Sequence, residues 1–204
     1  MRRMIRFTLV ALAGATLSGC LGGRPIRYYT VAVPPAPVQA TSAYPVSILI
    51  GRIGAPEILQ EQPILYRSGR NEIGTYAYHQ WAESPVQMVK IMLLRRLRAS
   101  GRFQSVSPLG SSALGEFVLQ GRLYDFEEVD KGGAITALVS MEFQLIDRNT
   151  RKTVWNHFYS RTEPVQGKTI PDVVAALDRN LEQGLTEMES ELNTYFSTNL
   201  HHNP

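Results

Sequence analysis

The stretch ITALVSMEFQLID, residues 135–147, is apolar at every second position from Ile135 to Leu145. Successive side chains of a strand point to opposite faces, so these positions share one face of an extended chain. Strict alternation of this length is typical of a half-buried strand. The stretch therefore predicts a long strand with one face in the core.

Two further strand patterns lie on either side of this stretch. Residues 116–129 place Phe117, Leu119 and Leu123 on one face, and residues 153–162 form the third pattern. Polar turns separate them, at residues 130–133 (DKGG) and 147–152 (DRNTRK). Strands joined by short polar turns pair antiparallel, so we expect a three-stranded meander.

A helix is predicted to begin directly after Ser84, which is suited to be its N-cap. Pro85 takes the first helical position and Gln87 the capping-box position, and Gly101 ends the helix after Ser100. The apolar stripe of this helix consists of Val86, Val89, Met92, Leu93, Leu94 and Leu97, and its basic residues are Lys90, Arg95, Arg96 and Arg98. We expect the basic residues to be a solvated face; the alternative is a face that docks a partner or lipid headgroups.

A second amphipathic helix is predicted over residues 171–196. Its apolar residues recur every three or four positions: Val174, Leu177, Leu181, Leu185, Met188, Leu192 and Phe196. Packing both helices on one face of the sheet gives a two-layer α/β (α+β) sandwich. The sheet of this fold is expected to be mixed and mostly antiparallel.

The first half of the chain adds shorter strand patterns. Residues 45–53 favour a largely buried strand, and residues 63–67 and 72–79 favour a hairpin closed by a polar turn at 68–71. Residues 103–106 are expected to form a short strand. Residues 26–33 are a candidate first strand, followed by a proline-rich, extended connector.

The N-terminus carries the pattern Leu17-Ser18-Gly19-Cys20, which resembles the lipobox of bacterial lipoproteins at all four positions. A basic start and an apolar run too short to span a bilayer precede it, as in a secretory signal. Cleavage between Gly19 and Cys20 would make Cys20, the single cysteine of the chain, the acylated first residue. Several acyl chains, each worth about 0.8 kcal/mol per buried methylene, anchor a protein firmly without a membrane span.

These features predict the organisation of the chain. Residues 1–19 are a signal peptide, 20–44 the lipidated cysteine with its tether and first strand, 45–199 one domain, and 200–204 a tail. The signal removes three of the 21 basic residues, which leaves 18 against 18 acidic residues. A neutral domain has no electrostatic reason to bind nucleic acid.

Motifs of catalysis are absent from the sequence. Nucleophile elbows, phosphate-binding glycine loops and HExxH motifs do not occur, and none of the four histidines has a metal-ligand neighbour at helical or ribbon spacing. Acidic residues gather at Asp125, Glu127, Glu128 and Asp130, where we expect a solvated hairpin end instead of a calcium or acid–base site. The sequence thus predicts no catalytic residue, no metal, and no cofactor besides the lipid on Cys20.

Four features in order resemble the ABC-type transport auxiliary lipoproteins, the family that includes the paraquat-inducible Pqi-type intermembrane transport lipoprotein. They are the lipobox, Tyr28-Tyr29-Thr30, the hairpin strand Pro63-Ile64-Leu65-Tyr66-Arg67, and Trp81-Ala82-Glu83-Ser84-Pro85. Within these stretches we expect Tyr66, Arg67, Trp81 and Pro85 to be structural, bracing the hairpin against the start of the helix.

The resemblance implies a non-catalytic subunit of a lipid transport system, in which an ABC transporter works with a periplasmic MCE-type protein. The lipoprotein would dock on that protein from the outer membrane of a Gram-negative bacterium, facing the periplasm. Leu21 is not the aspartate that commonly retains lipoproteins at the inner membrane. Because MCE-type partners form rings, the resemblance also implies a homo-oligomeric ring.

Two other classes of function stay open. One is a structural envelope lipoprotein that stabilises an outer-membrane assembly without moving lipid. The other is a carrier or enzyme for a soluble ligand, which would need a deep apolar pocket with convergent polar groups.

Overall fold

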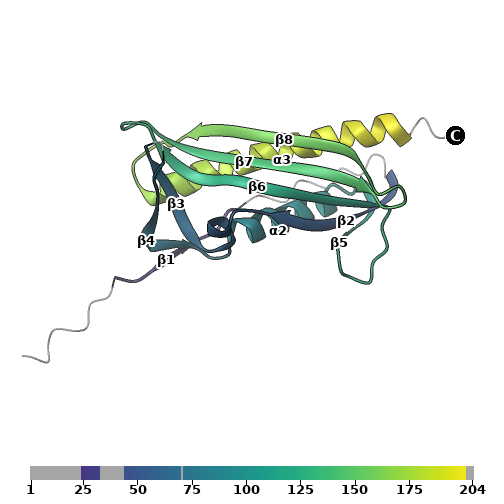
Figure 1. Ribbon diagram of the computed structural model, residues 1–204, viewed down its shortest axis with the longest axis horizontal. Helices are drawn as coiled ribbons and strands as arrows, with labels where there is room; N and C mark the ends of the chain where they lie inside the picture. The colour runs from purple at the N-terminus through teal and green to yellow at the C-terminus, as the bar shows by residue number, and fades with distance from the viewer. Residues whose placement is uncertain (1–23, 33–43, 70, 201–204) are drawn as a thin grey trace, which may run out of the picture.

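The computed structural model describes residues 24–32, 44–69 and 71–200, which form one mixed sheet and two long helices (Figure 1). The strands are β1 (Arg27–Tyr29), β2 (Tyr44–Gly54), β3 (Pro63–Ser68), β4 (Ile73–Trp81), β5 (Phe103–Pro108), β6 (Phe117–Asp130), β7 (Ile135–Asp147) and β8 (Lys152–Pro164). The helices are α2 (Pro85–Ala99) and α3 (Ile170–Leu200), and a short 3-10 helix, η1 (Glu57–Gln60), precedes β3. Figure 1 shows both long helices behind the sheet, which confirms the predicted two-layer α/β fold.

Strand β6 is the centre of the sheet. One of its edges pairs with β7 along its whole length, in the predicted antiparallel meander that continues to β8. Its other edge is divided: residues 117–122 pair with β2 and residues 127–130 pair with β3, both parallel. The sheet therefore branches at β6, with β5 beyond β2 and with β4 and β1 beyond β3.

Strand directions agree with the expected mixed sheet. The pairs β1–β4, β2–β5, β2–β6 and β3–β6 are parallel. The antiparallel pairs are β3–β4, β6–β7 and β7–β8, and the last two are the longest in the sheet. The antiparallel ladders thus carry most of the paired length, while the parallel pairs join the first half of the chain to the second.

The core lies between the meander and α3. Residues of β7 that alternate in sequence face it, and the predicted stripe of α3 from Leu177 to Phe196 is fully buried. At the start of α3, Val173 is buried and Val174 only partly so, which moves the stripe by one position from the prediction. A Cβ at Gly184 would overlap Met141 and the ring of Tyr159, so this glycine lets α3 lie close to the sheet.

The start of α2 is as predicted. The Ser84 side chain accepts a hydrogen bond from the backbone N–H of Gln87 at 3.4 Å, and Pro85 is the first helical residue. After the helix, Gly101 has a positive φ of 63°, a conformation that favours glycine. Local capping chemistry therefore fixes both ends of this helix.

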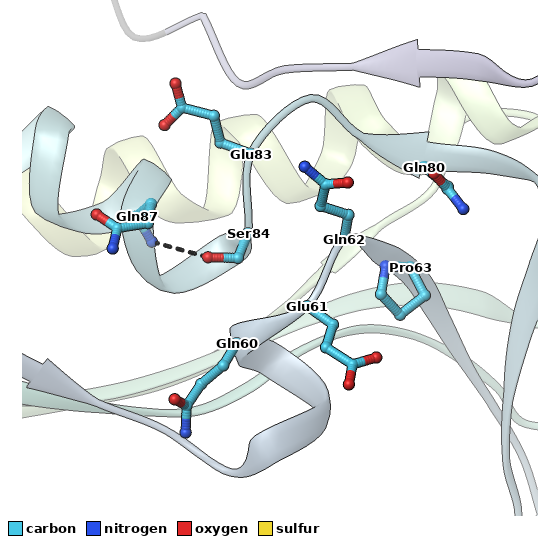
Figure 2. A pocket seen from close by; sticks show the side chains of 8 residues that line it. All are labelled: Gln60, Glu61, Gln62, Pro63, Gln80, Glu83, Ser84 and Gln87. Carbon is cyan, nitrogen blue, oxygen red and sulfur yellow. Dashed lines mark hydrogen bonds between the residues drawn. The ribbon is translucent and has the colours of Figure 1, made fainter.

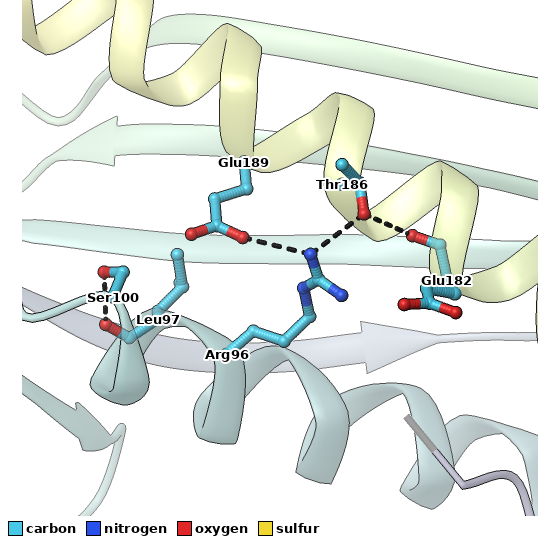
Figure 3. A network of polar contacts seen from close by, with 6 residues as sticks. All are labelled: Arg96, Leu97, Ser100, Glu182, Thr186 and Glu189. Atoms are coloured by element: carbon cyan, nitrogen blue, oxygen red, sulfur yellow. Dashed lines mark hydrogen bonds and ion pairs between the residues drawn. The ribbon is translucent and has the colours of Figure 1, made fainter. Parts of the chain in front are cut away.

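The basic residues of α2 are not all solvated, contrary to the prediction. Arg96 is only 7% exposed and extends toward α3 (Figure 3). Its Nη2 donates to Thr186 Oγ1 at 2.9 Å and lies 3.3 Å from Glu189 Oε2. Arg96 thus links the two helices, whereas Arg95 is exposed and Arg98 donates to the carbonyl of Val106.

The first strand is shorter than residues 26–33 and pairs parallel with β4. Several predictions fall outside the described residues: the signal peptide 1–19 with Gly19 and Cys20, most of the proline-rich connector, one residue of the turn at 68–71, and all but the first residue of the tail at 200–204. Among the residues that the structure describes, no helix is long and apolar enough to cross a bilayer.

Candidate interaction site at the hairpin end

The hairpin of β3 and β4 pairs Tyr66 with Gly74 and Arg67 with Ile73. The Tyr66 ring lies over Gly74, where any side chain would overlap it, and packs against the Tyr76 ring with centroids 4.9 Å apart. On its other edge β3 pairs parallel with the end of β6. This pairing brings Arg67 and both tyrosines to the acidic residues of β6.

Arg67 forms an ion pair with Glu127 of β6. Its Nε lies 2.6 Å from Glu127 Oε1, and the Glu127 residue is only 2% exposed. Burial raises the pKa of Glu127, because the loss of hydration outweighs the attraction of Arg67. The hydrogen bond to Glu127 in turn raises the pKa of Arg67, which stays charged.

Glu128, the next residue of β6, is 6% exposed and accepts a hydrogen bond from the Tyr76 hydroxyl at 2.7 Å. Burial, and then this bond, raise the pKa of Tyr76. The prediction of a solvated acidic cluster is therefore wrong for Glu127 and Glu128. Asp130 fits it better, since its side chain accepts from the backbone of Gly133 in the turn.

Trp81 and Pro85 lie at the other end of β4, where the chain enters α2. Trp81 is fully buried, and its ring packs against Phe126 with centroids 5.4 Å apart. Its backbone N–H donates to the carbonyl of Gln62 at 2.7 Å, while its indole Nε1 has no hydrogen-bond partner among the described residues. Pro85 is buried at the first position of α2.

A groove of about 650 Å³ opens between these segments (Figure 2). It is lined by Gln60, Glu61, Gln62, Pro63, Gln80, Glu83, Ser84 and Gln87. The lining residues come from η1 and the segment after it, from the end of β4, and from the start of α2. Two of the stretches that carry the family resemblance, one starting at Pro63 and one ending at Pro85, thus meet at a single groove.

The groove offers hydrogen-bond acceptors and negative charge. The Gln60 amide donates to the carbonyl of Ala55 at 3.0 Å and the Gln62 amide to that of Ala82 at 3.1 Å. Both amide oxygens therefore remain available as acceptors, beside the carboxylates of Glu61 and Glu83. A shallow, polar groove of this kind suits the peptide groups and basic side chains of a protein partner better than an acyl chain.

Histidines and carboxylates do not converge in the described part of the chain: it contains no group of three or more His, Cys, Asp or Glu residues placed to hold a metal ion. His79 instead shares a hydrogen bond with the Tyr29 hydroxyl at 2.9 Å. His157 stacks on Trp155 with ring planes 6° apart.

Comparison with known proteins identifies the family. The family model for the ABC-type transport auxiliary lipoprotein component matches residues 29–189. The chain belongs to this family. The match begins at the last residue of β1 and ends within α3, so the hairpin, the groove and strands β2 to β8 of this auxiliary lipoprotein all lie inside it. No curated protein sequence matches the chain.

Solved structures share the fold of this auxiliary lipoprotein. A Xanthomonas campestris protein of the family called DUF330 superposes with a TM-score of 0.77 at 19% identity, over 86% of this chain and 99% of that one. A hypothetical protein from Chlamydia trachomatis gives a TM-score of 0.51 at 10% identity, over 76% of this chain and 100% of that one. At such identities the likeness concerns the fold alone.

Sequence reasoning named Glu127 and Glu128 but missed that both are buried and paired. Their spacing in a strand before a glycine turn is that of a solvated hairpin end, and nothing local indicates burial. Their partners Arg67 and Tyr76 come from a hairpin about 50 to 60 positions earlier. The parallel pairing of β3 with β6 was the missing information.

Proposed function

We propose that this auxiliary lipoprotein is a non-catalytic, outer-membrane-anchored subunit of an ABC/MCE-type lipid transport system. Acyl chains on Cys20 would hold it at the outer membrane, facing the periplasm. The folded domain would dock on the periplasmic MCE-type protein. The family match over residues 29–189 is the observation that carries this proposal, because it associates the domain with ABC-type transport.

The docking site in this proposal is the polar groove of Figure 2. Its free amide oxygens and the carboxylates of Glu61 and Glu83 would receive backbone amides and basic side chains from a loop of the MCE-type partner. Tyr66, Arg67, Trp81 and Pro85 have a structural role here, since they fix the hairpin and the helix start between which the groove lies. Such polar contacts give specificity and orientation more than raw affinity.

A closed homo-oligomeric ring would match a ring-forming partner. Neighbouring copies would then meet through two different surfaces, as heterologous contacts require. The outer sides of α2 and α3 differ in charge: exposed Arg95 and half-buried Lys90 lie on α2, and exposed Glu191 and half-buried Glu187, which pairs with Arg161, lie on α3. This difference supports contacts between α2 of one copy and α3 of the next.

Anchoring is tested by replacing Cys20 with Ala. We expect loss of lipid labelling and an uncleaved precursor that stays at the inner membrane, because acylation needs the thiol. Radiolabelled palmitate incorporation and membrane fractionation measure this. Normal maturation and outer-membrane fractionation of the Cys20→Ala protein would contradict the proposal.

Docking is tested by reversing one charge in the groove. We expect Glu83→Lys to weaken binding to the MCE-type partner about tenfold, since a close like-charge contact costs more than 1 kcal/mol. The matched control is Glu72→Lys, an equal charge change at an exposed position of the β3–β4 turn, outside the groove and the helices. Surface plasmon resonance on the acylated proteins in detergent compares the affinities of the groove variant and the control variant for the MCE-type partner. Equal affinities would remove the groove from the proposal.

A further inference from the structure

The edge formed by β1 and β4 exposes aromatic and apolar side chains. Tyr28 is 62% exposed, and Ile26 and Tyr78 are each 44% exposed. Tyrosine is enriched at membrane–water interfaces, where its ring meets the apolar region and its hydroxyl stays hydrated. Exposed aromatic side chains also occur on the outer side of the meander, at Tyr124 and Phe158, but there the Tyr124 hydroxyl is bonded to the carboxylate of Glu142. The three side chains of the β1–β4 edge lie close together at one end of the sheet.

Basic side chains accompany them. A cavity of about 280 Å³ beside β1 is lined by Arg24, Pro25, Arg27, Tyr78 and His79, with no carboxylate among its residues. The Arg24 guanidinium lies over the Tyr78 ring, 5.9 Å from its centroid. Arg24 and Arg27 are both exposed, and within the described ranges neither has an ion-pair partner.

Covalent geometry places this surface close to the site of acylation. Four Cα steps separate Cys20 from Arg24 in the sequence, and a fully extended chain spans at most about 3.6 Å per step, so roughly 14 Å. Figure 1 shows β1 toward one end of the long axis of the molecule, whereas the loop between β5 and β6 projects below β5 toward the other end. Strand β6, which runs along this axis, has 14 residues at about 3.3 Å each and is roughly 46 Å long.

We propose that the surface formed by Arg24, Ile26, Arg27, Tyr28 and Tyr78, here called the β1 surface, lies on the phospholipid bilayer that holds the acyl chains. The two arginines bind the phosphates of anionic headgroups, and the tyrosines and Ile26 enter the headgroup layer. This proposal rests on the proposed acylation of Cys20. It adds an orientation, in which the β1 end contacts the membrane and the β5–β6 loop extends away from it.

Spin labelling tests this orientation on the full acylated chain. Because acylation uses the only native cysteine, an introduced cysteine is the single free thiol. Nitroxide is attached at Thr30→Cys, which is exposed beside the β1 surface, and at the matched control Ser112→Cys in the β5–β6 loop. Both proteins are reconstituted in vesicles of equal parts phosphatidylcholine and phosphatidylglycerol. Collision with membrane-soluble oxygen is then compared with collision with a water-soluble nickel chelate.

We expect the ratio of oxygen to nickel collisions to be several-fold higher at position 30 than at position 112. Adding Arg24→Gln and Arg27→Gln should lower the ratio at position 30 toward the control value, because each arginine near an anionic surface changes the binding equilibrium about fivefold. The effect of the two substitutions should disappear in pure phosphatidylcholine.

Three results would overturn the proposal in distinguishable ways. Equal ratios at the two positions, with Cys20 shown by mass spectrometry to be acylated, would refute the orientation and leave the proposed function standing. A high ratio at position 30 that the arginine substitutions do not change would refute the role of the headgroup charges. An unmodified Cys20, seen as a second free thiol, would refute both the proposed function and the inference.

Discussion

The two halves of β6 hold their neighbours by different chemistry. Residues 117–123 lie against β7 and the helices, and the side chains that meet there are apolar and fully buried, as at Leu119, Leu123 and Phe143. Residues 126–130 meet the hairpin, where Glu127 and Glu128 are buried and paired with Arg67 and Tyr76. Apolar packing gives the first half its stability. In the second half Phe126 also packs against Trp81, and the Arg67–Glu127 and Tyr76–Glu128 pairs add directional contacts to the hairpin.

The largest effect is expected in the apolar half. Phe143→Ala should lower the free energy of unfolding by about 4 kcal/mol, because the removed ring leaves a cavity between the sheet and the helices. Urea unfolding of the mature protein followed by circular dichroism measures this. Phe158→Ala, at a 61% exposed position of the neighbouring strand, is the control and should change stability by less than about 0.5 kcal/mol. Similar losses for both variants would refute a core on one face of the meander.

The next effect is in the polar half. Arg67→Met keeps much of the side-chain volume but leaves Glu127 buried without its partner, which should cost about 3 kcal/mol at neutral pH. The control is Arg161→Met, which breaks an ion pair between two half-exposed side chains and should cost under about 1 kcal/mol. Equal costs in urea unfolding would show that the Arg67 pair is no stronger than a surface pair.

The pH dependence of Arg67→Met follows from the raised pKa of Glu127. A carboxyl whose pKa is higher in the folded than in the unfolded state binds more protons when folded, so its contribution improves as pH falls through the folded pKa. Arg67 lowers the pKa of Glu127, so its removal raises that pKa further. We therefore expect the cost of Arg67→Met to shrink between neutral pH and about pH 5, while that of Phe143→Ala stays constant. A cost independent of pH would mean that Glu127 is not the group left unpaired.

A smaller effect is expected from Tyr76→Phe. It removes the one hydrogen bond that Glu128 accepts from a side chain in the described residues, and should cost about 1.5 kcal/mol, as for a bond to a charged group. Tyr124→Phe is the control, because the Tyr124 hydroxyl donates to Glu142 at an exposed position. The midpoint temperature of thermal unfolding should be lower for Tyr76→Phe than for Tyr124→Phe. Equal midpoint temperatures would contradict the burial of Glu128.

The smallest loss of stability is expected at Ser84, between the end of β4 and the start of α2. Ser84→Ala removes the side-chain acceptor at the start of α2 and should cost about 1 kcal/mol. Ser84→Asp, which restores an acceptor and adds a charge favourable at a helix N-terminus, should recover the wild-type value in urea unfolding. A loss that Asp does not rescue would assign the effect to the groove instead of the cap.

Features set by local sequence patterns were predicted, whereas those set by contacts between distant segments were not. The alternation of residues 135–147 and the cap at Ser84 are local patterns, so β7, the meander and the start of α2 followed directly from them. The burial of Glu127 depends on a parallel pairing with a distant strand, and that of Arg96 on a helix about 90 positions later. Local periodicity carries no information about either partner. The Pro63 and Trp81 stretches were recognised in the sequence, but that they meet at a polar groove became visible only in the fold.

Photo-crosslinking at the groove tests the proposed docking on the MCE-type protein. A photoreactive amino acid at Gln62, in the groove, is compared with one at Glu191, on the outer side of α3, in the full-length acylated protein within intact cells. We predict a crosslink from position 62 to the MCE-type periplasmic protein and no crosslink to that protein from position 191. Crosslinks from position 62 only to outer-membrane barrels or peptidoglycan-associated proteins would contradict it and favour a structural envelope lipoprotein.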